Sequence, residues 1–344
     1  MKVLITGGAG FIGCHLARHF SAASHDVTIF DNLSRHGSKH NLEWLQREAT
    51  RSRLRFIQAD IRNVEAVAEA VRGQEVICHL AAQVAVTTSV ANPRQDFEIN
   101  ALGTFNALEA ARAGGAHPIF IYASTNKVYG GLEAVGIIEG PVRYAFADMP
   151  LGVPETQPLD FHSPYGCSKG AGDQYVRDYA RIFALPAVVF RQGTVYGTRQ
   201  FGVEDQGVWA HFAISALLGR PITIYGDGKQ VRDILYVDDL ARLFELAVER
   251  IDCARGQVYN VGGGHEFTLS VWSEAGPLLE QLAGRRLKVR YADWRPGDQR
   301  VYISDIRKAE RELGWRPTVK PAEGLERMWG WIVENRRLLE GEQG

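Results

Sequence analysis

The glycine-rich segment at residues 6–13 constrains the fold of this chain more than any other feature. It reads TGGAGFIG and lies between the apolar run Val3–Ile5 and the helical periodicity of Ile12–Ser21. Glycines spaced in this way let the backbone approach a pyrophosphate, and the helix that follows offers free N–H groups and a favourable dipole. A tight strand–helix turn without a ligand is the plainer alternative, but this context favours a dinucleotide site. The residues predicted to hold the dinucleotide here are Gly7, Gly10, Phe11, Ile12 and Gly13.

The rest of the first half repeats the alternation of short apolar runs and amphipathic stretches. We expect strands at Val3–Ile5, Val27–Phe30, Leu54–Ile57, Val76–His79, Ile119–Tyr122 and Ala187–Phe190, and helices at Ile12–Ser21, Val64–Val71, Phe97–Ala113 and Tyr165–Phe183. Parallel strands need long crossovers, and the intervening stretches are long enough to be helices. The pattern therefore predicts an α/β fold with a doubly wound parallel sheet of the Rossmann type.

The regular alternation stops after Phe190 and returns only briefly, with a helix expected at Val237–Val248 and a strand at Val258–Val261. We expect residues 1–190 and 235–262 to form the dinucleotide-binding domain, and residues 191–234 and 263–344 to form a smaller mixed α/β substrate domain. Residues 131–162 contain four prolines and few regular periods. A loop this long inside a compact domain is usually functional or disordered, and whether it closes over a ligand stays open.

The charge balance points away from a polyanionic partner and from a membrane. The formal net charge is -1, so we expect neither nucleic acid nor an anionic membrane surface as a partner. There is no apolar run of about 18 residues, and the apolar run at the start is too short for a signal peptide. The four cysteines show neither a CxxC pair nor zinc spacing, so we expect reduced thiols in a cytoplasmic protein and no metal site.

Polar residues at the ends of the next strands are candidates for the adenosine half of the cofactor. Asp31 ends the second strand, about 20 residues past the glycines. A carboxylate there accepts hydrogen bonds from the ribose hydroxyls and repels a 2′-phosphate. That favours NAD over NADP, although Arg35 is a contrary sign because it could accommodate the extra phosphate. An Asp after a strand is more often a helix cap, which weakens the case for Asp60. The set expected on this side is Asp31, Asn32, Ser34, Arg35, Asp60, Ile61, Leu80, Ala81, Ala82, Gln83 and Asn100.

Three hydroxyl and amine groups form the candidate catalytic centre. Tyr165 and Lys169 are spaced i, i+4 and so share one face of a predicted helix. A neighbouring ammonium and a positive nicotinamide ring favour the phenolate, so we expect a lowered pKa for Tyr165 and a role as acid and base. Lys169 would also hold the nicotinamide ribose. Thr125 follows the fifth strand, where it could hydrogen-bond the reacting hydroxyl. A surface Tyr–Lys pair is the bland alternative.

These motifs together resemble the extended short-chain dehydrogenase/reductase family, also described as the NAD-dependent epimerase/dehydratase family, over nearly the whole chain. The resemblance implies a Rossmann domain with NAD, a second domain for a nucleotide sugar, and a homodimer or a higher homo-oligomer. The family's Thr–Tyr–Lys triad maps onto Thr125, Tyr165 and Lys169. Under this resemblance Phe97–Ala113 and Tyr165–Phe183 are the candidate interface helices, although their apolar residues could equally pack within one subunit.

The residues after Thr125 discriminate within that family. Sugar-nucleotide dehydratases of the family have an Asp-Glu pair there, whereas this chain has Asn126 and Lys127, so dehydration is disfavoured. The closest resemblance is to the epimerases that invert C2 of a CDP-linked hexose. It rests on stretches such as LDFHSPYGCSKG at 159–170, GKQVRD at 228–233 and DQRV at 298–301. Bidentate guanidinium groups suit diphosphate oxygens, although a surface ion pair is the commoner fate of an arginine. The substrate candidates are Thr88, Thr125, Asn126, Lys127, Gln192, Gln206, Arg232 and Arg300.

Two rival functions remain open from the sequence. A UDP-hexose 4-epimerase would use the same triad with a different sugar pose, and an ordinary CDP- or GDP-hexose is also compatible with these residues. A non-catalytic NAD-binding scaffold is the alternative from another class, since a fold does not fix a function. Intact Thr125, Tyr165 and Lys169 argue against the scaffold. The nucleobase and the natural sugar stay undetermined.

Overall fold

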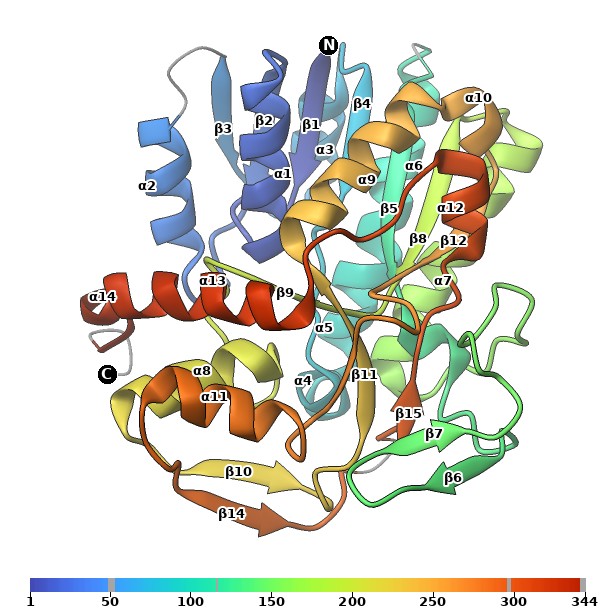
Figure 1. Ribbon diagram of the computed structural model, residues 1–344. Coiled ribbons are helices and arrows are strands. Elements are labelled where there is room, and N and C mark those ends of the chain that lie inside the picture. The colour runs from blue at the N-terminus through green and yellow to red at the C-terminus, as the bar shows by residue number, and fades with distance from the viewer. Residues whose placement is uncertain (49–52, 116, 296–297, 341–344) are drawn as a thin grey trace.

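The computed structural model of the protein describes residues 1–48, 53–115, 117–295 and 298–340. At its centre lies a seven-stranded parallel sheet with the order β3-β2-β1-β4-β5-β8-β12 (Figure 1). Its strands are β1 (Lys2–Thr6), β2 (Asp26–Asp31), β3 (Leu54–Gln58), β4 (Val76–His79), β5 (Ile119–Thr125), β8 (Ala187–Gln192) and β12 (Val258–Val261). The predicted doubly wound parallel sheet is confirmed, and all of the strands predicted for it are present.

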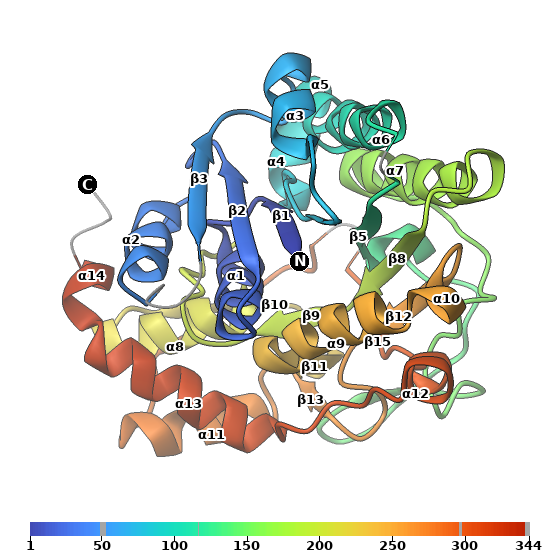
Figure 2. The same ribbon diagram turned by 90° about the horizontal axis from the view of Figure 1, so that it is seen from above.

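Helices cover both faces of this sheet, which is why its strands read as continuous apolar runs. Helices α1 (Phe11–Ala22) and α9 (Val237–Glu249) lie on one face, together with α2 (Ser38–Glu48) near the β3 edge. The opposite face carries α3 (Val64–Val71), α6 (Gly103–Ala113) and α7 (Ser163–Ile182), as Figure 2 shows. Two apolar clusters result, one on each face, and they hold the strand ends in fixed positions.

The helix predicted at Phe97–Ala113 is interrupted. After the short helices α4 (Val86–Ala91) and α5 (Pro93–Phe97), the chain makes one π-helical turn, η1 (Glu98–Leu102), before α6 begins. A π-helical turn inserts an extra residue into the helical repeat and shifts which side chains face inward. Asn100 lies in this turn and is fully buried. The continuous apolar periodicity of the sequence did not reveal the interruption.

The second part of the molecule packs below the carboxyl ends of the sheet strands in Figure 1. Strand β11 pairs with β9, β13 and β15, while β10 pairs with β14. Its elements are β9 (Thr194–Tyr196), α8 (Val208–Leu218), β10 (Ile222–Tyr225), β11 (Val231–Tyr236), β13 (Thr268–Ser270), α11 (Ala275–Ala283), β14 (Val289–Ala292), β15 (Val301–Tyr302), α13 (Pro321–Glu334) and α14 (Arg336–Glu340). The chain touches the sheet again through α10 (Ile251–Ala254) and α12 (Arg307–Leu313). The division into two domains remains a proposal, and β11 spans the boundary expected at residue 235.

Residues 131–162 are more regular than the sequence indicated. They contain an antiparallel hairpin of β6 (Ile137–Glu139) and β7 (Tyr144–Phe146). Tyr144 and Phe146 are buried in an apolar cluster with Tyr302 of β15. Each strand has only three residues, which is too short for an alternating pattern to stand out.

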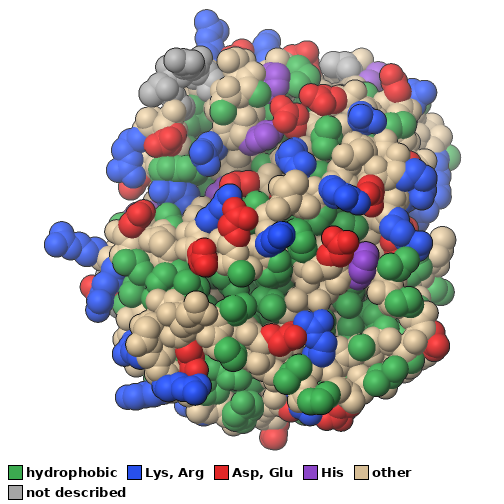
Figure 3. All heavy atoms as spheres, in the orientation of Figure 1, with side chains coloured by type: hydrophobic (Ala, Val, Ile, Leu, Met, Phe, Trp, Pro, Cys, Tyr) green, Lys and Arg blue, Asp and Glu red, His purple; other side chains and the backbone are tan. Residues whose placement is uncertain are grey.

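The outer surface carries charges of both signs. Figure 3 shows basic and acidic side chains interspersed over the face in view, with apolar side chains between them. None of the described helices is both long enough and apolar enough to cross a membrane.

Candidate active site

A cavity of about 1100 Å³ lies where the carboxyl ends of the sheet strands meet the second part of the molecule. Its lining comes from the turns after β1, β2, β4, β5 and β8, from α7, and from the segment between β9 and β11. This volume exceeds the usual range for one drug-sized ligand, about 300–1,000 Å³. The sheet order reverses at β1 and β4, which is the switch point where doubly wound sheets bind ligands.

The glycine turn after β1 is shaped for close approach by a ligand. Gly7 has a φ of +69°, and a Cβ built there would lie 2.8 Å from the backbone nitrogen of Ala81. A Cβ on Gly13 would lie 2.2 Å from the carbonyl oxygen of Gly7. Gly10 is the N-cap of α1 and has no side chain to cap it, so the N–H groups of the first turn remain open. These features fit a diphosphate at the helix N-terminus.

Asp31 lies at the end of β2 beside this turn. Its carboxylate accepts hydrogen bonds from the backbone N–H groups of Ala9 at 3.0 Å and Leu33 at 2.8 Å. Burial raises the pKa of this carboxyl, against the lowering effect of those bonds. A carboxylate has about four acceptor positions, so Asp31 retains capacity for ribose hydroxyls. It is the strongest candidate for the adenosine ribose.

Asp60 and Arg35 frame the rest of the adenosine side. Asn32 Nδ2 donates to Asp60 Oδ2 at 2.9 Å, and the guanidinium of Arg62 holds the pKa of Asp60 well below its usual range. Arg35 reaches across the cavity and donates to the side-chain oxygen of Gln206, so it connects the sheet to the second part. All the cofactor-side candidates except Asn100 line the cavity.

The catalytic candidates come together on two elements. Thr125 ends β5, while Tyr165 and Lys169 lie on the first turns of α7, and all three line the cavity. The hydroxyl of Thr125 lies close enough to that of Tyr165 to lower the pKa of the phenol. Lys169 Nζ lies 4.2 Å from the ring centroid of Tyr122. The structure therefore brings together the three residues that the sequence proposed for proton transfer.

We expected a lowered pKa for Tyr165, but in the protein alone its surroundings raise it. Burial raises the pKa of Tyr165 to about 12, against the lowering effect of the Thr125 hydroxyl. Burial also lowers the pKa of Lys169 to about 7, which Asp173 and Asp96 oppose. The i, i+4 spacing showed that Lys169 is near, but it did not show how strongly the pocket excludes water. In the protein alone, desolvation outweighs the neighbouring ammonium.

Asn100 is placed behind the cavity and not in its wall. Its side-chain oxygen accepts the backbone N–H of Gln83 at 2.8 Å, and its amide donates to Asp96 Oδ1 at 3.1 Å and to Ser168 Oγ at 3.1 Å. Asp96 also accepts a hydrogen bond from Gln83 Nε2 at 2.9 Å. This buried network joins the turn after β4 to α7. Asn100 therefore contributes to the position of these elements, and its direct contact with a cofactor stays a prediction.

The substrate candidates divide into two groups. All of them line the cavity except Arg300, whose guanidinium lies over the rings of Tyr144 and Trp294 at 5.1 and 5.3 Å. Since Arg300 lies outside this lining, its contact with a diphosphate stays a prediction. Gln192 has a buried side-chain nitrogen without a hydrogen-bond partner among the described residues, so it can donate to a ligand.

An arginine in the second part of the site was not among the residues predicted from the sequence. Arg295 lies 3.9 Å from the ring centroid of Tyr225 and forms an ion pair with Asp205 at 3.3 Å. All three residues line the cavity. Arg295 lies about 70 residues beyond Tyr225, so no local spacing or periodicity connects them. Only the pairing of β10 with β14 brings Tyr225 close to Arg295.

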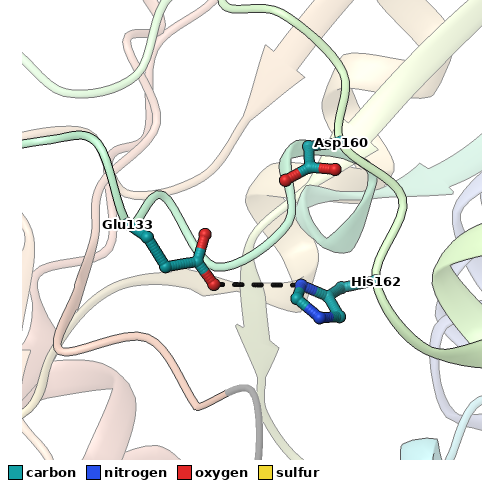
Figure 4. A group of neighbouring side chains, drawn as sticks. All are labelled: Glu133, Asp160 and His162. Atoms are coloured by element: carbon teal, nitrogen blue, oxygen red, sulfur yellow. Dashed lines mark ion pairs between the residues drawn. The ribbon is translucent and has the colours of Figure 1, made fainter.

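Glu133, Asp160 and His162 form an exposed group outside the cavity (Figure 4). Their ligand-type atoms lie within 4.8 Å of one another, and His162 Nδ1 lies 3.9 Å from Glu133 Oε1. Exposed pairs of this kind are common and contribute little energy. We assign this group no metal.

The chain is similar over its length to enzymes that modify nucleotide sugars. Residues 4–328 match the sequence family described as GDP-mannose 4,6 dehydratase. A CDP-paratose 2-epimerase of Salmonella typhi is 44% identical over 338 residues, which cover 96% of this chain and 99% of that protein.

Solved structures share the fold at lower identity. The UDP-glucose 4-epimerase of Thermotoga maritima, crystallised with UDP-glucose, has a TM-score of 0.83 and 32% identity, covering 98% of this chain and 100% of that chain. A dTDP-glucose 4,6-dehydratase from Streptomyces venezuelae, solved with NAD bound, has a TM-score of 0.82 and 31% identity, covering 98% of each chain. The similar proteins thus include both epimerases and dehydratases.

Proposed function

Since this chain belongs to the extended short-chain dehydrogenase/reductase family, in the group described as GDP-mannose 4,6 dehydratase, we propose that it is an NAD-dependent epimerase of a nucleotide-linked hexose. The proposed reaction is inversion at C2 of a CDP-hexose of the CDP-paratose and CDP-tyvelose type. The observation that carries this proposal is the Thr125–Tyr165–Lys169 group at the cavity wall, followed by Asn126 and Lys127 in place of an acid–base pair of carboxylates.

The cofactor is NAD, and the cradle described above fits it. The glycine turn has room for a diphosphate only while positions 7 and 13 lack a Cβ, and Asp31 offers a carboxylate to the ribose hydroxyls. A carboxylate there disfavours the 2′-phosphate of NADP. When bound, NAD supplies the reversible hydride acceptance that no side chain of the protein can provide.

The protein's own residues handle the proton and the orientation of the sugar. Tyr165 takes the proton of the reacting hydroxyl and later returns it, while Thr125 holds the same oxygen through its hydroxyl. Lys169 supports the phenolate by its charge, and Asp96 and Asp173 favour its protonated form. An oxidised carbon is planar and has no handedness, so inversion requires only that the sugar present its other face.

Dehydration is disfavoured at this site. Loss of water needs an acid at the leaving hydroxyl and a base at the neighbouring carbon, in addition to the tyrosine. Asn126 Nδ2 faces Gln299 Oε1 at 3.4 Å, so it is an amide engaged with another amide. Lys127 is a cation, and burial lowers its pKa to about 8. Neither residue supplies a carboxylate for this chemistry.

A UDP-hexose 4-epimerase is the second candidate, favoured by the likeness to the Thermotoga maritima enzyme. It differs from the first candidate only in which sugar carbon lies at Tyr165 and which base is held. A non-catalytic NAD-binding scaffold is a remote third candidate, and the intact catalytic group argues against it. Four cysteines without disulfides are consistent with the cytoplasm, which we propose as the location.

The test is product analysis by NMR with CDP-, GDP- and UDP-hexoses in deuterated water. We expect inversion at C2 of a CDP-hexose without solvent deuterium at that carbon, because hydride leaves and returns within one active site. Inversion at C4 of a UDP-hexose would instead establish the second candidate. Loss of water, or deuterium at the inverted carbon, would contradict both epimerase mechanisms. Bound NAD with no conversion across the panel would favour the scaffold.

A further inference from the structure

Lys127 occupies a place in the cavity wall that connects the two catalytic elements. It lies on the 3₁₀ turn η2 (Asn126–Tyr129), and its backbone N–H donates to Thr125 Oγ1 at 3.2 Å. Its carbonyl oxygen would lie 3.3 Å from a Cβ built on Gly166, the residue after Tyr165. The backbone of Lys127 therefore lies against the Thr125 hydroxyl and against the first turn of α7, and Lys127 contributes to the cavity lining.

The other cations of this part of the wall already have partners. Arg232 Nη2 forms an ion pair with Asp298 Oδ1 at 2.7 Å, and Arg295 pairs with Asp205. For Lys127 Nζ, the described residues provide neither a hydrogen-bond acceptor nor an ion pair. Burial and the charge of Arg232 lower its pKa to about 8, against the opposite effect of Asp298. A desolvated ammonium beside a second cation is a site that an anion would stabilise.

The connectivity of a nucleotide sugar says where that anion must lie. The diphosphate is attached to C1, and C2 is bonded directly to C1, whereas C4 lies across the ring. An enzyme that oxidises C2 must therefore hold the sugar-linked phosphate close to its catalytic hydroxyls. An enzyme that oxidises C4 must hold the same phosphate on the far side of the sugar. A cation whose backbone contacts the Thr125 hydroxyl favours the first arrangement.

Building on the proposed function, we propose that Lys127 binds the sugar-linked phosphate and thereby places C2 rather than C4 at Tyr165. Arg232 lines the same cavity, and its charge lowers the pKa of Lys127, so an anion bound at Lys127 would interact with both cations. Lys127 is a specificity-determining residue in this arrangement, and the proton transfer stays with Tyr165. At this sequence position a dehydratase of the family has an acidic side chain, whereas here a lysine binds the phosphate.

The first test compares the binding of CDP and CMP to the NAD-loaded enzyme by titration calorimetry, because CDP carries the phosphate in question and CMP lacks it. The Lys127→Gln variant should lose about 10- to 100-fold in affinity for CDP, the scale of a charged hydrogen bond, with little change for CMP. Lys127→Arg, which keeps the charge, should recover most of the CDP affinity. The matched control Lys320→Gln removes an exposed lysine outside the cavity and should change neither affinity.

The second test measures inversion at C2 and at C4 of a CDP-hexose that carries both hydroxyls. Lys127→Gln should lower kcat/KM for C2 by at least tenfold and raise the C4 share of the products, with wild-type NAD content and melting temperature. If the wild type does not invert C2, the proposed function fails. If the wild type inverts C2 and Lys127→Gln keeps full CDP affinity and C2 selectivity, the role of Lys127 is overturned. A loss of sugar affinity with unchanged CDP affinity also overturns it.

Discussion

At the scale of single residues, the pKa of Tyr165 in the protein alone is higher than a catalytic base needs. Its hydroxyl is desolvated, and the neighbouring Thr125 hydroxyl opposes the rise of its pKa. Lys169 lies over the ring of Tyr122, and the charges of Asp173 and Asp96 favour its protonated form. The phenol therefore becomes a useful base only when positive charge from a bound cofactor is added.

Replacing Tyr165 by Phe tests this role directly. We expect kcat for epimerisation to fall by at least about 100-fold, because a positioned acid or base contributes on that scale. Steady-state kinetics with NMR detection would measure it, and bound NAD should remain stoichiometric. Tyr175→Phe is the control, since that tyrosine is on the same helix with its ring exposed. A Tyr165→Phe enzyme with near-normal turnover would contradict the assignment.

Lys169 gives the protein a dependence of stability on pH. Its pKa of about 7 in the folded protein lies below the ordinary value of 10.5, so the unfolded chain holds more protons between these values. Stability contributed through this group therefore rises with pH from about 7 toward 10. Lys169→Met removes the buried amine and should abolish that rise. The variant should therefore melt at a higher temperature than the wild type at about pH 6, and this difference should shrink as the pH increases.

The measurement is calorimetry on protein prepared without nucleotide, from about pH 6 to about pH 9.5. Lys320→Met serves as the control, because its exposed ammonium should give a difference from wild type that does not vary with pH in this range. A constant difference between Lys169→Met and wild type would show that the ammonium is hydrated through the cavity and that its pKa is ordinary.

At the scale of secondary-structure elements, a buried ion pair joins α7 to the sheet. Asp173 of α7 accepts two hydrogen bonds from Arg191 of β8, at 2.9 and 3.0 Å, and a third from Ser124 of β5 at 2.8 Å. Arg191 also donates to the hydroxyl of Tyr129 at 3.0 Å. This network joins α7, which carries Tyr165 and Lys169, to β5, which ends at Thr125, so it fixes the position of α7 relative to Thr125.

Breaking this pair should be costly. Arg191→Met leaves the fully buried carboxylate of Asp173 without its counter-ion, and we expect the free energy of unfolding in urea to fall by about 3–5 kcal/mol. The double variant with Asp173→Asn should recover part of that loss. Arg94→Met, which removes an exposed partner of Glu98, should change it by less than about 1 kcal/mol. Equal effects of the two arginine substitutions would show that burial does not strengthen the inner pair.

The elements that the sequence predicted well are those whose burial is continuous. Val76–His79 is buried along its whole length and was predicted with its observed bounds. Helix α2 was missed because few of its side chains are buried, chiefly Leu42 and Leu45, so its apolar stripe is narrow. The pairing of β10 with β14 joins segments about 65 residues apart, and such long-range contacts leave no local pattern.

At the scale of the whole molecule, the sequence predicted one half of the site better than the other. Residues at the carboxyl ends of parallel strands, such as Asp31 and Thr125, are placed by a general rule of doubly wound sheets. No comparable rule places residues in the second part. Arg232 reaches the cavity while Arg300 lies outside its lining, although both were proposed for the same phosphate. The contacts of Arg300 with Tyr144 and Trp294 join segments far apart in the chain, so the sequence shows no local pattern for them.

The outer face of α5, α6 and α7 carries exposed aromatic side chains, and we expect it to join two copies of the chain. Phe105 of α6 and Tyr175 of α7 are 37% and 49% exposed, with ring centroids 5.8 Å apart. Both lie on helices of the sheet face opposite α1 and α9 (Figure 2). Burying such a patch against its own symmetry mate would form an isologous interface, the commonest arrangement in homo-oligomers.

Sedimentation equilibrium tests the expected homodimer. The wild type should sediment as a dimer at micromolar concentration, and Phe105→Glu with Tyr175→Glu should shift it to a monomer, because desolvating two carboxylates in an apolar interface is unfavourable. Ile138→Glu, at an exposed apolar position on the β6–β7 hairpin, should leave the dimer intact. Since both substituted aromatic rings are exposed in the single chain, the monomer should keep its fold and its bound NAD. If the wild type sediments as a monomer, these rings do not form a dimer interface and pack only within the subunit.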